Sequence, residues 1–263
     1  MQLTLSGRTA IITGGSLGLG QAMAQAFYQA GARVAIVARR ENVLAETKAA
    51  IAATEAPIGA RIEAFACDVA DGGALSRMHD AVVATLGPVD IVVNNAGKAV
   101  AKPFEKLTDQ DWQDDLDLKL MAAVRLTRLV WPGMVARRWG RVINILNTFA
   151  KAPGANTSPT SVTRAAGMAL TKVLAGEGAP HNVLVNALLI GLIRSDQIRR
   201  QWERSGANQD LETFVAEFGK RLPMGRMGEA GECASTALFL ASEAASYVTG
   251  CAINMDGGMC PVV

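Results

Sequence analysis

The chain has 263 residues, of which 50% are hydrophobic, and its formal net charge is +2. A balance so close to neutral argues against nucleic acid or a membrane surface as a partner, and no apolar stretch is long enough to span a bilayer. The four cysteines show no metal-ligand spacing with histidine, so we predict reduced thiols, no metal site and a cytoplasmic location.

Strand-like and helix-like patterns alternate along the whole chain. In order, they are a strand at Arg8–Thr13, a helix at Leu17–Ala30, a strand at Arg33–Ala38, a helix at Glu41–Thr54, a strand at Arg61–Ala66, a helix at Gly73–Leu86, a strand at Val89–Val93, a long helix at Asp109–Arg137 bent by Pro132, a strand at Arg141–Leu146, a helix at Pro159–Gly178, a strand at Asn182–Leu188, a helix at Glu229–Ser242 and a strand at Cys251–Met255. This rhythm predicts a Rossmann fold of the α/β class, a doubly wound, mostly parallel sheet of seven strands. Because the alternation never stops, we predict a single domain over residues 1–263, with a helical substrate flap around residues 191–228.

The first strand ends in a glycine-rich turn that leads directly into the first helix. The turn has the sequence Thr13-Gly14-Gly15-Ser16-Leu17-Gly18-Leu19-Gly20. Glycines let the backbone approach a pyrophosphate, and a helix N-terminus presents free N–H groups to it. A position after the first strand of a βαβ unit is the context that such a motif requires. We therefore predict a dinucleotide site that includes Gly14, Ser16, Leu17, Gly18, Leu19 and Gly20.

The end of the second strand indicates which dinucleotide is bound. Proteins that bind NAD usually carry an acidic residue there, which contacts the ribose 2′-hydroxyl. This chain has Ala38-Arg39-Arg40 instead, and a guanidinium is a better partner for a 2′-phosphate. We predict that NADP(H) is favoured over NAD(H), with Arg39 as the contact. The alternative is that Arg39 and Arg40 are solvated surface charges.

Further motifs follow the glycine turn in order. They are Asp68, Asn94-Asn95-Ala96-Gly97, Val185-Asn186 with Gly191, Gly225-Arg226, Gly250 and Asp256-Gly257-Gly258. With them the chain resembles the short-chain dehydrogenase/reductase family over nearly its whole length, and the 3-oxoacyl-carrier-protein reductases in particular. The resemblance implies a homotetramer, or failing that a dimer, with residues 109–137 and 158–178 at its interfaces. It also implies that the cofactor is contacted by Asp68, Val69, Asn95, Gly97, Arg164 and Ile193.

The resemblance ends at the catalytic residues. The family uses a tyrosine as proton donor, a lysine four positions later, a serine that orients the carbonyl and an asparagine that supports a proton relay. The matching positions in this chain are Thr160, Arg164, Asn147 and Lys119 respectively. Ser195 stands where a threonine is usual. Both tyrosines, Tyr28 and Tyr247, lie elsewhere in the expected fold.

These substitutions change the available chemistry. An aliphatic hydroxyl such as that of Thr160 is a far poorer acid than a phenol. Arg164 can hold ribose hydroxyls but does not release its proton. Lys119 provides a proton that exchanges near neutral pH if burial lowers its pKa. We predict that Asn147 holds a carbonyl, that Thr160 lies beside it, and that Lys119 supplies the proton through water.

The substrate is less well defined. Basic residues are expected on segments that surround the nicotinamide pocket, namely Lys98, Lys102, Lys119, Lys151, Arg164 and Arg194. They indicate either an anionic small-molecule substrate or solvated loop charges. The first hypothesis is an NADP(H)-dependent oxidoreductase that acts on a carbonyl or hydroxyl group. The alternatives are a non-redox decarboxylase, lyase or hydrolase in which Arg164 and Lys119 stabilise an enolate, and a catalytically inactive nucleotide-binding protein, because the fold alone does not decide function.

Overall fold

A computed structural model describes residues 3–100, 102–194, 196–206 and 209–263, and Ser195 lies outside them. The strands are β1 (Thr9–Thr13), β2 (Arg33–Ala38), β3 (Arg61–Ala66), β4 (Ile91–Asn94), β5 (Gly140–Asn147), β6 (Val183–Ile190) and β7 (Ala252–Met255). The α-helices are α1 (Gly18–Gln29), α2 (Glu41–Ala52), α3 (Gly72–Leu86), α4 (Asp109–Leu116), α5 (Ala122–Arg137), α6 (Thr160–Gly178), α7 (Asp196–Ser205), α8 (Leu211–Gly219) and α9 (Ala230–Ala241). The predicted alternation is confirmed.

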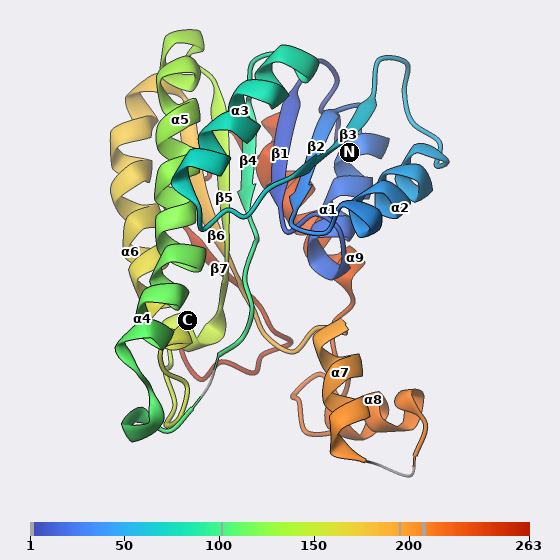
Figure 1. The fold of residues 1–263 in the computed structure, drawn as a ribbon, viewed down its shortest axis with the longest axis vertical. Helices are drawn as coiled ribbons and strands as arrows, with labels where there is room; N and C mark the ends of the chain where they lie inside the picture. The colour runs from blue at the N-terminus through green and yellow to red at the C-terminus, as the bar shows by residue number, and fades with distance from the viewer. Residues whose placement is uncertain (1–2, 101, 195, 207–208) are drawn as a thin grey trace.

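The strands form one sheet in the order β3-β2-β1-β4-β5-β6-β7 (Figure 1). Every described pair is parallel, so the sheet is fully parallel rather than mostly parallel. Strands such as β1 and β6 are buried along their whole length, because helices cover both faces of the sheet. The strand order reverses its direction between β1 and β4, and ligands of such sheets bind at the carboxyl ends of the strands at this point.

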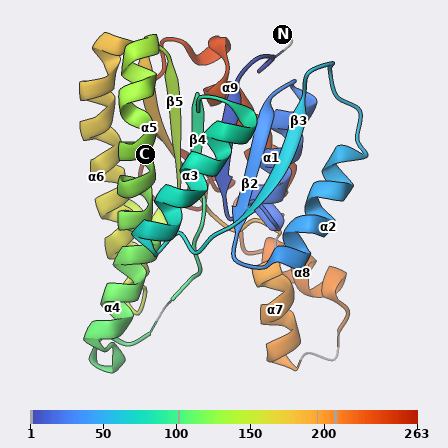
Figure 2. The same cartoon turned by 45° about the horizontal axis from the view of Figure 1, so that its top comes forward.

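Two groups of helices enclose the sheet (Figures 1 and 2). One core joins α1, α2 and α9 to one face, with Phe27 and Leu44 among its buried side chains. The other joins α3 and α5 to the opposite face, with Leu75 and Leu126. Among the described residues, no helix is long and apolar enough to cross a membrane. The four cysteines are free thiols.

The helix predicted over Asp109–Arg137 is interrupted at a different place from the one expected. Pro132 lies inside α5, which continues past it to Arg137. The irregularity is a π-helical turn at Asp117–Met121, between α4 and α5. A π turn inserts an additional residue and is frequent at functional sites. Here it contains the buried Lys119.

The predicted helical flap contains α7 and α8, which extend away from the sheet in Figure 1. They enclose a small apolar cluster that includes Ile198, Leu222 and Met227. Arg194 forms an ion pair with Glu212 of α8, which ties this segment to the chain that leaves β6. Its role as a substrate flap remains a prediction.

A chain of buried polar side chains connects the centre of the sheet to α6. Asn94 at the end of β4 donates a hydrogen bond from Nδ2 to Asn144 Oδ1 at 2.9 Å. Asn144 Nδ2 donates in turn to Thr171 Oγ1 at 2.9 Å, and Thr171 donates to the Gly167 carbonyl oxygen at 2.8 Å. Because each of these side chains is buried, the chain fixes α6 against the strands that carry the site.

We expect Thr171→Val to lower the free energy of unfolding by about 1–3 kcal/mol, because it leaves the buried Asn144 amide without an acceptor. Thr85→Val is a matched control, since Thr85 on α3 also bonds the carbonyl oxygen four residues earlier but is exposed. The control should change stability by no more than about 0.5 kcal/mol. Urea unfolding of the three proteins measures both, and equal losses would show that the polar chain contributes nothing.

Candidate functional site

The glycine turn between β1 and α1 has the backbone geometry that its sequence predicts. Gly14 and Gly18 have φ angles of 64° and 55°, a region that glycine adopts without strain. A Cβ atom at Gly20 would collide with the Gly14 carbonyl. Asn95 fastens the turn to the end of β4, because its Nδ2 donates to the carbonyl oxygens of Thr13 at 2.9 Å and Gly14 at 3.2 Å.

The N-terminus of α1 is open to an anion. Leu17 occupies the N-cap position and provides no side-chain hydrogen bond, and the first turn contains no acidic residue. The first backbone N–H groups of a helix have no partner within the helix, and the helix dipole favours negative charge there. The turn therefore offers the free donors that a phosphate group requires.

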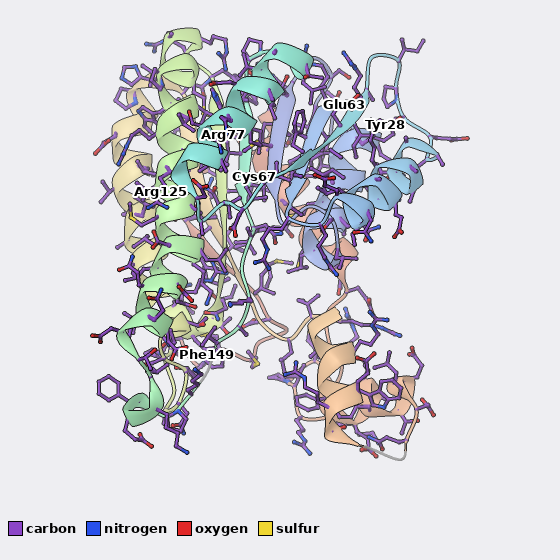
Figure 3. The ribbon with its side chains drawn as sticks, in the orientation of Figure 1. Tyr28, Glu63, Cys67, Arg77, Arg125 and Phe149 are labelled. Carbon is purple, nitrogen blue, oxygen red and sulfur yellow. The ribbon has the colours of Figure 1, made fainter. Side chains whose placement is uncertain are left out.

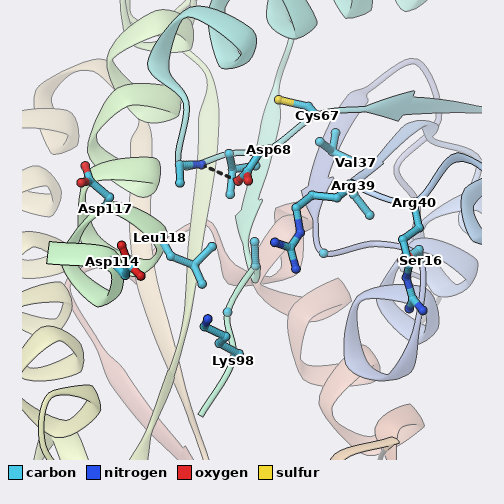
Figure 4. Close-up of a pocket in the computed structure, with 16 residues that line it drawn as sticks. Ser16, Val37, Arg39, Arg40, Cys67, Asp68, Lys98, Asp114, Asp117 and Leu118 are labelled. Carbon is cyan, nitrogen blue, oxygen red and sulfur yellow. Dashed lines mark hydrogen bonds between the residues drawn. The ribbon is translucent and has the colours of Figure 1, made fainter. Parts of the chain in front are cut away.

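A cleft of about 500 Å³ opens beside this turn (Figure 4). It is formed by segments that follow β1, β2, β3 and β4, together with the end of α4 and the adjoining π turn. Its lining consists of Gly14, Ser16, Val37, Ala38, Arg39, Arg40, Cys67, Asp68, Val69, Ala70, Ala96, Gly97, Lys98, Asp114, Asp117 and Leu118. The cleft lies at the switch point of the sheet, where a dinucleotide is expected.

The predicted cofactor residues divide into two groups. Six of them line the cleft, namely Gly14, Ser16, Arg39, Asp68, Val69 and Gly97. The others shape its surroundings: Leu17, Gly18, Leu19 and Gly20 form the start of α1, and Asn95 fastens the turn. Ile193 is buried and forms a β-bridge with Gly228 at the base of the flap. Arg40, which was left open as a surface charge, also lines the cleft.

Lys119 is buried in an ion pair. Its side chain and that of Asp115, four residues earlier, are each 1% exposed, and the Lys119 ammonium donates to Asp115 Oδ1. Burial lowers the pKa of Lys119 to about 8, although the hydrogen bond and charge of Asp115 act in the opposite direction. The predicted titratable lysine therefore exists, but with a carboxylate partner that the sequence analysis did not identify.

Thr160 at the start of α6 is in direct contact with this lysine. Lys119 Nζ donates to Thr160 Oγ1 at 2.6 Å. Thr160 Oγ1 also donates to the Val100 carbonyl oxygen at 2.8 Å and accepts from the Val100 N–H at 3.1 Å. The Lys119 ammonium therefore reaches the Thr160 hydroxyl directly, and transfer of its proton through water stays a prediction.

Arg164 lies one helical turn further along α6, against Gly97. A Cβ atom at Gly97 would lie 2.6 Å from Arg164 Nη2, so any other residue there would require this guanidinium to move. Burial lowers the pKa of Arg164 to about 10. Arg164 Nε is buried without a hydrogen-bond partner among the described residues. An unpaired buried donor of this kind is typical of a group that awaits a ligand.

Asn147, at the end of β5, is near but not part of this network. Its side-chain oxygen is buried and has no donor in the described part of the chain. The amide is therefore able to form a hydrogen bond with a bound molecule. Among the described side chains, no hydrogen bond joins Asn147 to Lys119, Thr160 or Arg164.

Most of the basic residues expected around the pocket already have protein partners. Lys102 pairs with Asp111, Arg194 with Glu212 and Lys119 with Asp115. Lys151 Nζ donates to the Ala252 carbonyl oxygen at 2.9 Å. Lys98 lines the cleft, and it and Arg164 have no hydrogen-bond or ion-pair partner among the described residues.

The sequence analysis missed Asp115 and Thr163. Thr163 Oγ1 donates to Asp115 Oδ2 at 2.6 Å and thereby joins α6 to α4. One signal was present, since an acid four residues before a lysine lies on the same face of a helix. It was hidden among five aspartates within residues 109–117.

Neither tyrosine lies at the site. Tyr28 is at the C-terminal end of α1, at the opposite end of that helix from the glycine turn (Figure 3). Tyr247 is fully exposed. The described residues also contain no group of three or more His, Cys, Asp or Glu side chains arranged to hold a metal ion. Neither tyrosine is therefore in reach of the groups around Lys119 and Thr160.

Comparison with known proteins identifies relatives over the whole chain. The model of the family described as enoyl-(acyl carrier protein) reductase matches residues 14–260. The 3-oxoacyl-(acyl-carrier-protein) reductase of Aquifex aeolicus is 30% identical over 259 residues, which cover 98% of this chain and 100% of that protein. L-Sorbose reductase from Gluconobacter frateurii, solved with NADPH and L-sorbose, is similar with a TM-score of 0.94 and 33% identity, and the match covers 100% of both chains. An NADPH-bound short-chain oxidoreductase from Pseudomonas aeruginosa, described as containing an atypical catalytic center, has a TM-score of 0.90 and 34% identity, and the match covers 99% of both chains.

Proposed function

The chain belongs to the short-chain dehydrogenase/reductase family, and from this premise we propose that it is an NADP(H)-dependent oxidoreductase whose proton relay runs from Lys119 to Thr160. The observation that carries the proposal is the direct hydrogen bond of 2.6 Å from the buried Lys119 ammonium to the Thr160 hydroxyl. This bond ends at the position where the family that the chain resembles has its tyrosine. The substrate class is a carbonyl compound or the corresponding alcohol.

The cofactor proposal rests on the fit of the cleft to a dinucleotide phosphate. The uncapped N-terminus of α1 offers backbone donors to the pyrophosphate. Arg39 and Arg40 line the cleft where the second strand ends, and no carboxylate is present at residues 38–40. Arg164 would hold the nicotinamide ribose, which is supported by its Nη2 beside Gly97 and by its Nε, which has no partner among the described residues. The two solved relatives named above contain NADPH.

A bound NADPH would supply the hydride, and side chains of the chain would supply the proton. In reduction, the Thr160 O–H would turn from the Val100 carbonyl oxygen to the substrate oxygen and give up its proton, as Lys119 gives a proton to Thr160 Oγ1. Threonine alone is too weak an acid for this step, but a neighbouring ammonium with a pKa of about 8 removes the need for a free alkoxide. Asn147 is placed to orient the oxygen through its amide.

We still propose an anionic substrate, but fewer free cations support it than the sequence analysis expected. Four of the six basic residues have protein partners. Lys98 and Arg164 are therefore the cations available for an anionic group. The segment that contains α7 and α8 is the proposed substrate flap, because it follows β6 and begins at the carboxyl edge of the sheet.

We also propose a homotetramer or, failing that, a dimer. In both views α5 and α6 lie side by side on an outer flank of the molecule. Val162 and Val173 on α6 are 50% and 58% exposed and are therefore accessible to a second subunit. Gly167, by contrast, faces inward against Leu146, so its small size serves packing within the subunit.

NADPH should bind at least about tenfold more tightly than NADH, because one charge-assisted contact with the 2′-phosphate contributes roughly 1.5–3 kcal/mol. Arg39→Ala should remove most of this preference while NADH affinity stays nearly constant. Arg61→Ala is the control, because Arg61 starts β3 at the opposite end of that strand from the cleft. Fluorescence titration measures the affinities, and equal binding of the two nucleotides by the unaltered protein would contradict the prediction.

Lys119→Met should reduce the rate of carbonyl reduction by about 10²–10⁴-fold, since it removes the proton source. Thr160→Val should cause a loss of similar size, because it interrupts the only hydroxyl in contact with that ammonium among the described residues. NADPH affinity should change little in either variant, and Lys106→Met, at an exposed lysine, should behave as the unaltered protein. Oxidation of NADPH over a panel of ketones measures the rates.

Turnover that survives Lys119→Met would place the proton source in solvent or on the substrate. Because that variant leaves Asp115 buried without its partner, Asp115→Leu/Lys119→Met should be made as a second variant that removes both charges. If the unaltered protein turns over no carbonyl or alcohol in the panel, the oxidoreductase proposal is wrong.

The assembly prediction can be tested through the exposed face of α6. Val173→Glu should convert the tetramer to smaller species, because it places a charge in an apolar contact. Val83→Glu on α3 is the control, at a valine that is 37% exposed outside the proposed interface. Light scattering at micromolar concentration determines the mass, and a monomer for the unaltered protein would exclude the proposed assembly.

A further inference from the structure

We propose that Asp115 is a positioning residue of this site, which holds the Lys119 ammonium against the Thr160 hydroxyl and keeps it charged in a place shielded from water. The inference rests on the proposed function and assigns a part of the site for which the sequence motifs give no signal. It depends on three observations, namely the burial of Asp115, its hydrogen bonds and the charges that face Lys119.

The burial of Asp115 is unusual for its helix. Among the residues of α4, Asp115 is the buried one, and the other aspartates of that helix are more exposed. An apolar side chain at this position would avoid the cost of removing a carboxylate from water. A buried carboxylate is expected where a cation needs it, and the Lys119 ammonium is bonded to it.

Each carboxylate oxygen of Asp115 accepts a hydrogen bond from a different side chain. Oδ1 accepts from Lys119 Nζ. Oδ2 accepts from Thr163 Oγ1 at 2.6 Å, and Thr163 lies three residues after Thr160 on α6. The carboxylate therefore connects the lysine to the same helix that carries its acceptor. This arrangement fixes the direction in which Nζ points.

The remaining charges around Lys119 oppose its protonation. Arg164 from α6 and Lys98 from the segment after β4 lower the pKa of Lys119, as does burial, and Asp115 raises it through its hydrogen bond and its charge. The balance is a pKa of about 8. Without Asp115, the ammonium would face two cations in a buried site, and its proton would be lost at lower pH.

The direction of the pH effect follows from this balance. Carbonyl reduction needs the protonated lysine, so the rate falls as pH rises through the pKa of Lys119. Asp115→Asn keeps the size of the side chain and removes its charge, so the pKa decreases and the fall in rate begins at lower pH. Each unit of decrease reduces the ammonium fraction about tenfold on the alkaline side.

The test compares the pH dependence of kcat for carbonyl reduction in the unaltered protein and in Asp115→Asn. We expect the fall in rate near pH 8, the alkaline limb of the profile, to move to lower pH by at least about one unit, with a loss of about fivefold or more at pH 8 and about tenfold or more well above it. Asp115→Glu, which keeps the charge, should leave the limb near its original place. Asp109→Asn is the control, because Asp109 is an exposed aspartate of the same helix. If Asp115→Asn folds and its kcat falls at the same pH as that of the unaltered protein, the inference is wrong.

A measurement without turnover separates this inference from the proposed function. Lysines labelled with ¹³C at Cε are titrated by NMR, and Lys119 is assigned by the signal lost in Lys119→Met. Its midpoint should be near pH 8 and should fall by at least about one unit in Asp115→Asn. An unchanged midpoint overturns the role of Asp115 even if the enzyme is active, whereas a lowered midpoint in a protein with no turnover supports it and leaves the oxidoreductase proposal wrong.

Thr163→Val provides a second variant if Asp115→Asn does not fold. It removes the hydrogen bond to Oδ2 and keeps the charge. We expect kcat per folded molecule to decrease several-fold at all pH values, with the alkaline limb in its original place, because the ammonium is misdirected but still charged. An unchanged kcat per folded molecule would show that the contact between Thr163 and Asp115 serves only folding, and would overturn the positioning role.

Discussion

A cation that is held away from water must have a negative partner, and the ion pair of Asp115 and Lys119 meets this requirement at the centre of the site. The π turn between α4 and α5 contains the lysine, and α4 provides the carboxylate. Helix α6 provides the hydroxyls of Thr160 and Thr163, which bond to the two members of the pair. Side chains of α4, the π turn and α6 thus meet around one buried charge that needs a partner.

The cofactor end of the cleft is built in a different way, because it depends mainly on the backbone. This end requires glycines at positions 14 and 18, where φ is positive, and an uncapped start of α1. It requires few specific side chains. The proposed catalytic end depends on the functional groups of individual side chains. A fold of this family can therefore keep its dinucleotide cleft while the residues at the reacting end change, and the two ends of this site differ in that respect.

The sequence predicted the fold well because each strand is a short apolar run that ends in a turn signal. Strands β2 and β3 begin and end at the predicted residues, and the glycine spacing correctly located the loop beside the cleft. The π turn could not be predicted, because residues 117–121 have an ordinary helical composition. The spacing of four residues to Lys119 was the one local pattern that set Asp115 apart from Asp111 and Asp114. Its contact with Thr163 depends on how α6 packs, and the direct contact of Lys119 with Thr160 is likewise a tertiary property.

The substitutions at positions 119, 160 and 164 are physically coupled, so they are not independent losses of the residues that the family usually has there. A phenol at position 160 would extend past the point at which Lys119 Nζ lies 2.6 Å from the Thr160 oxygen, so the two groups could not both keep their places. An ammonium at position 164 would replace a delocalised guanidinium with a compact charge close to Lys119, where Arg164 already opposes protonation. Lys119 in turn needs Asp115, and an asparagine at position 119 would leave that carboxylate buried without a cation. Residues in one such network do not contribute additively, so the threonine, lysine and aspartate form one alternative arrangement, and the charge of Arg164 beside it adds to the need for the aspartate.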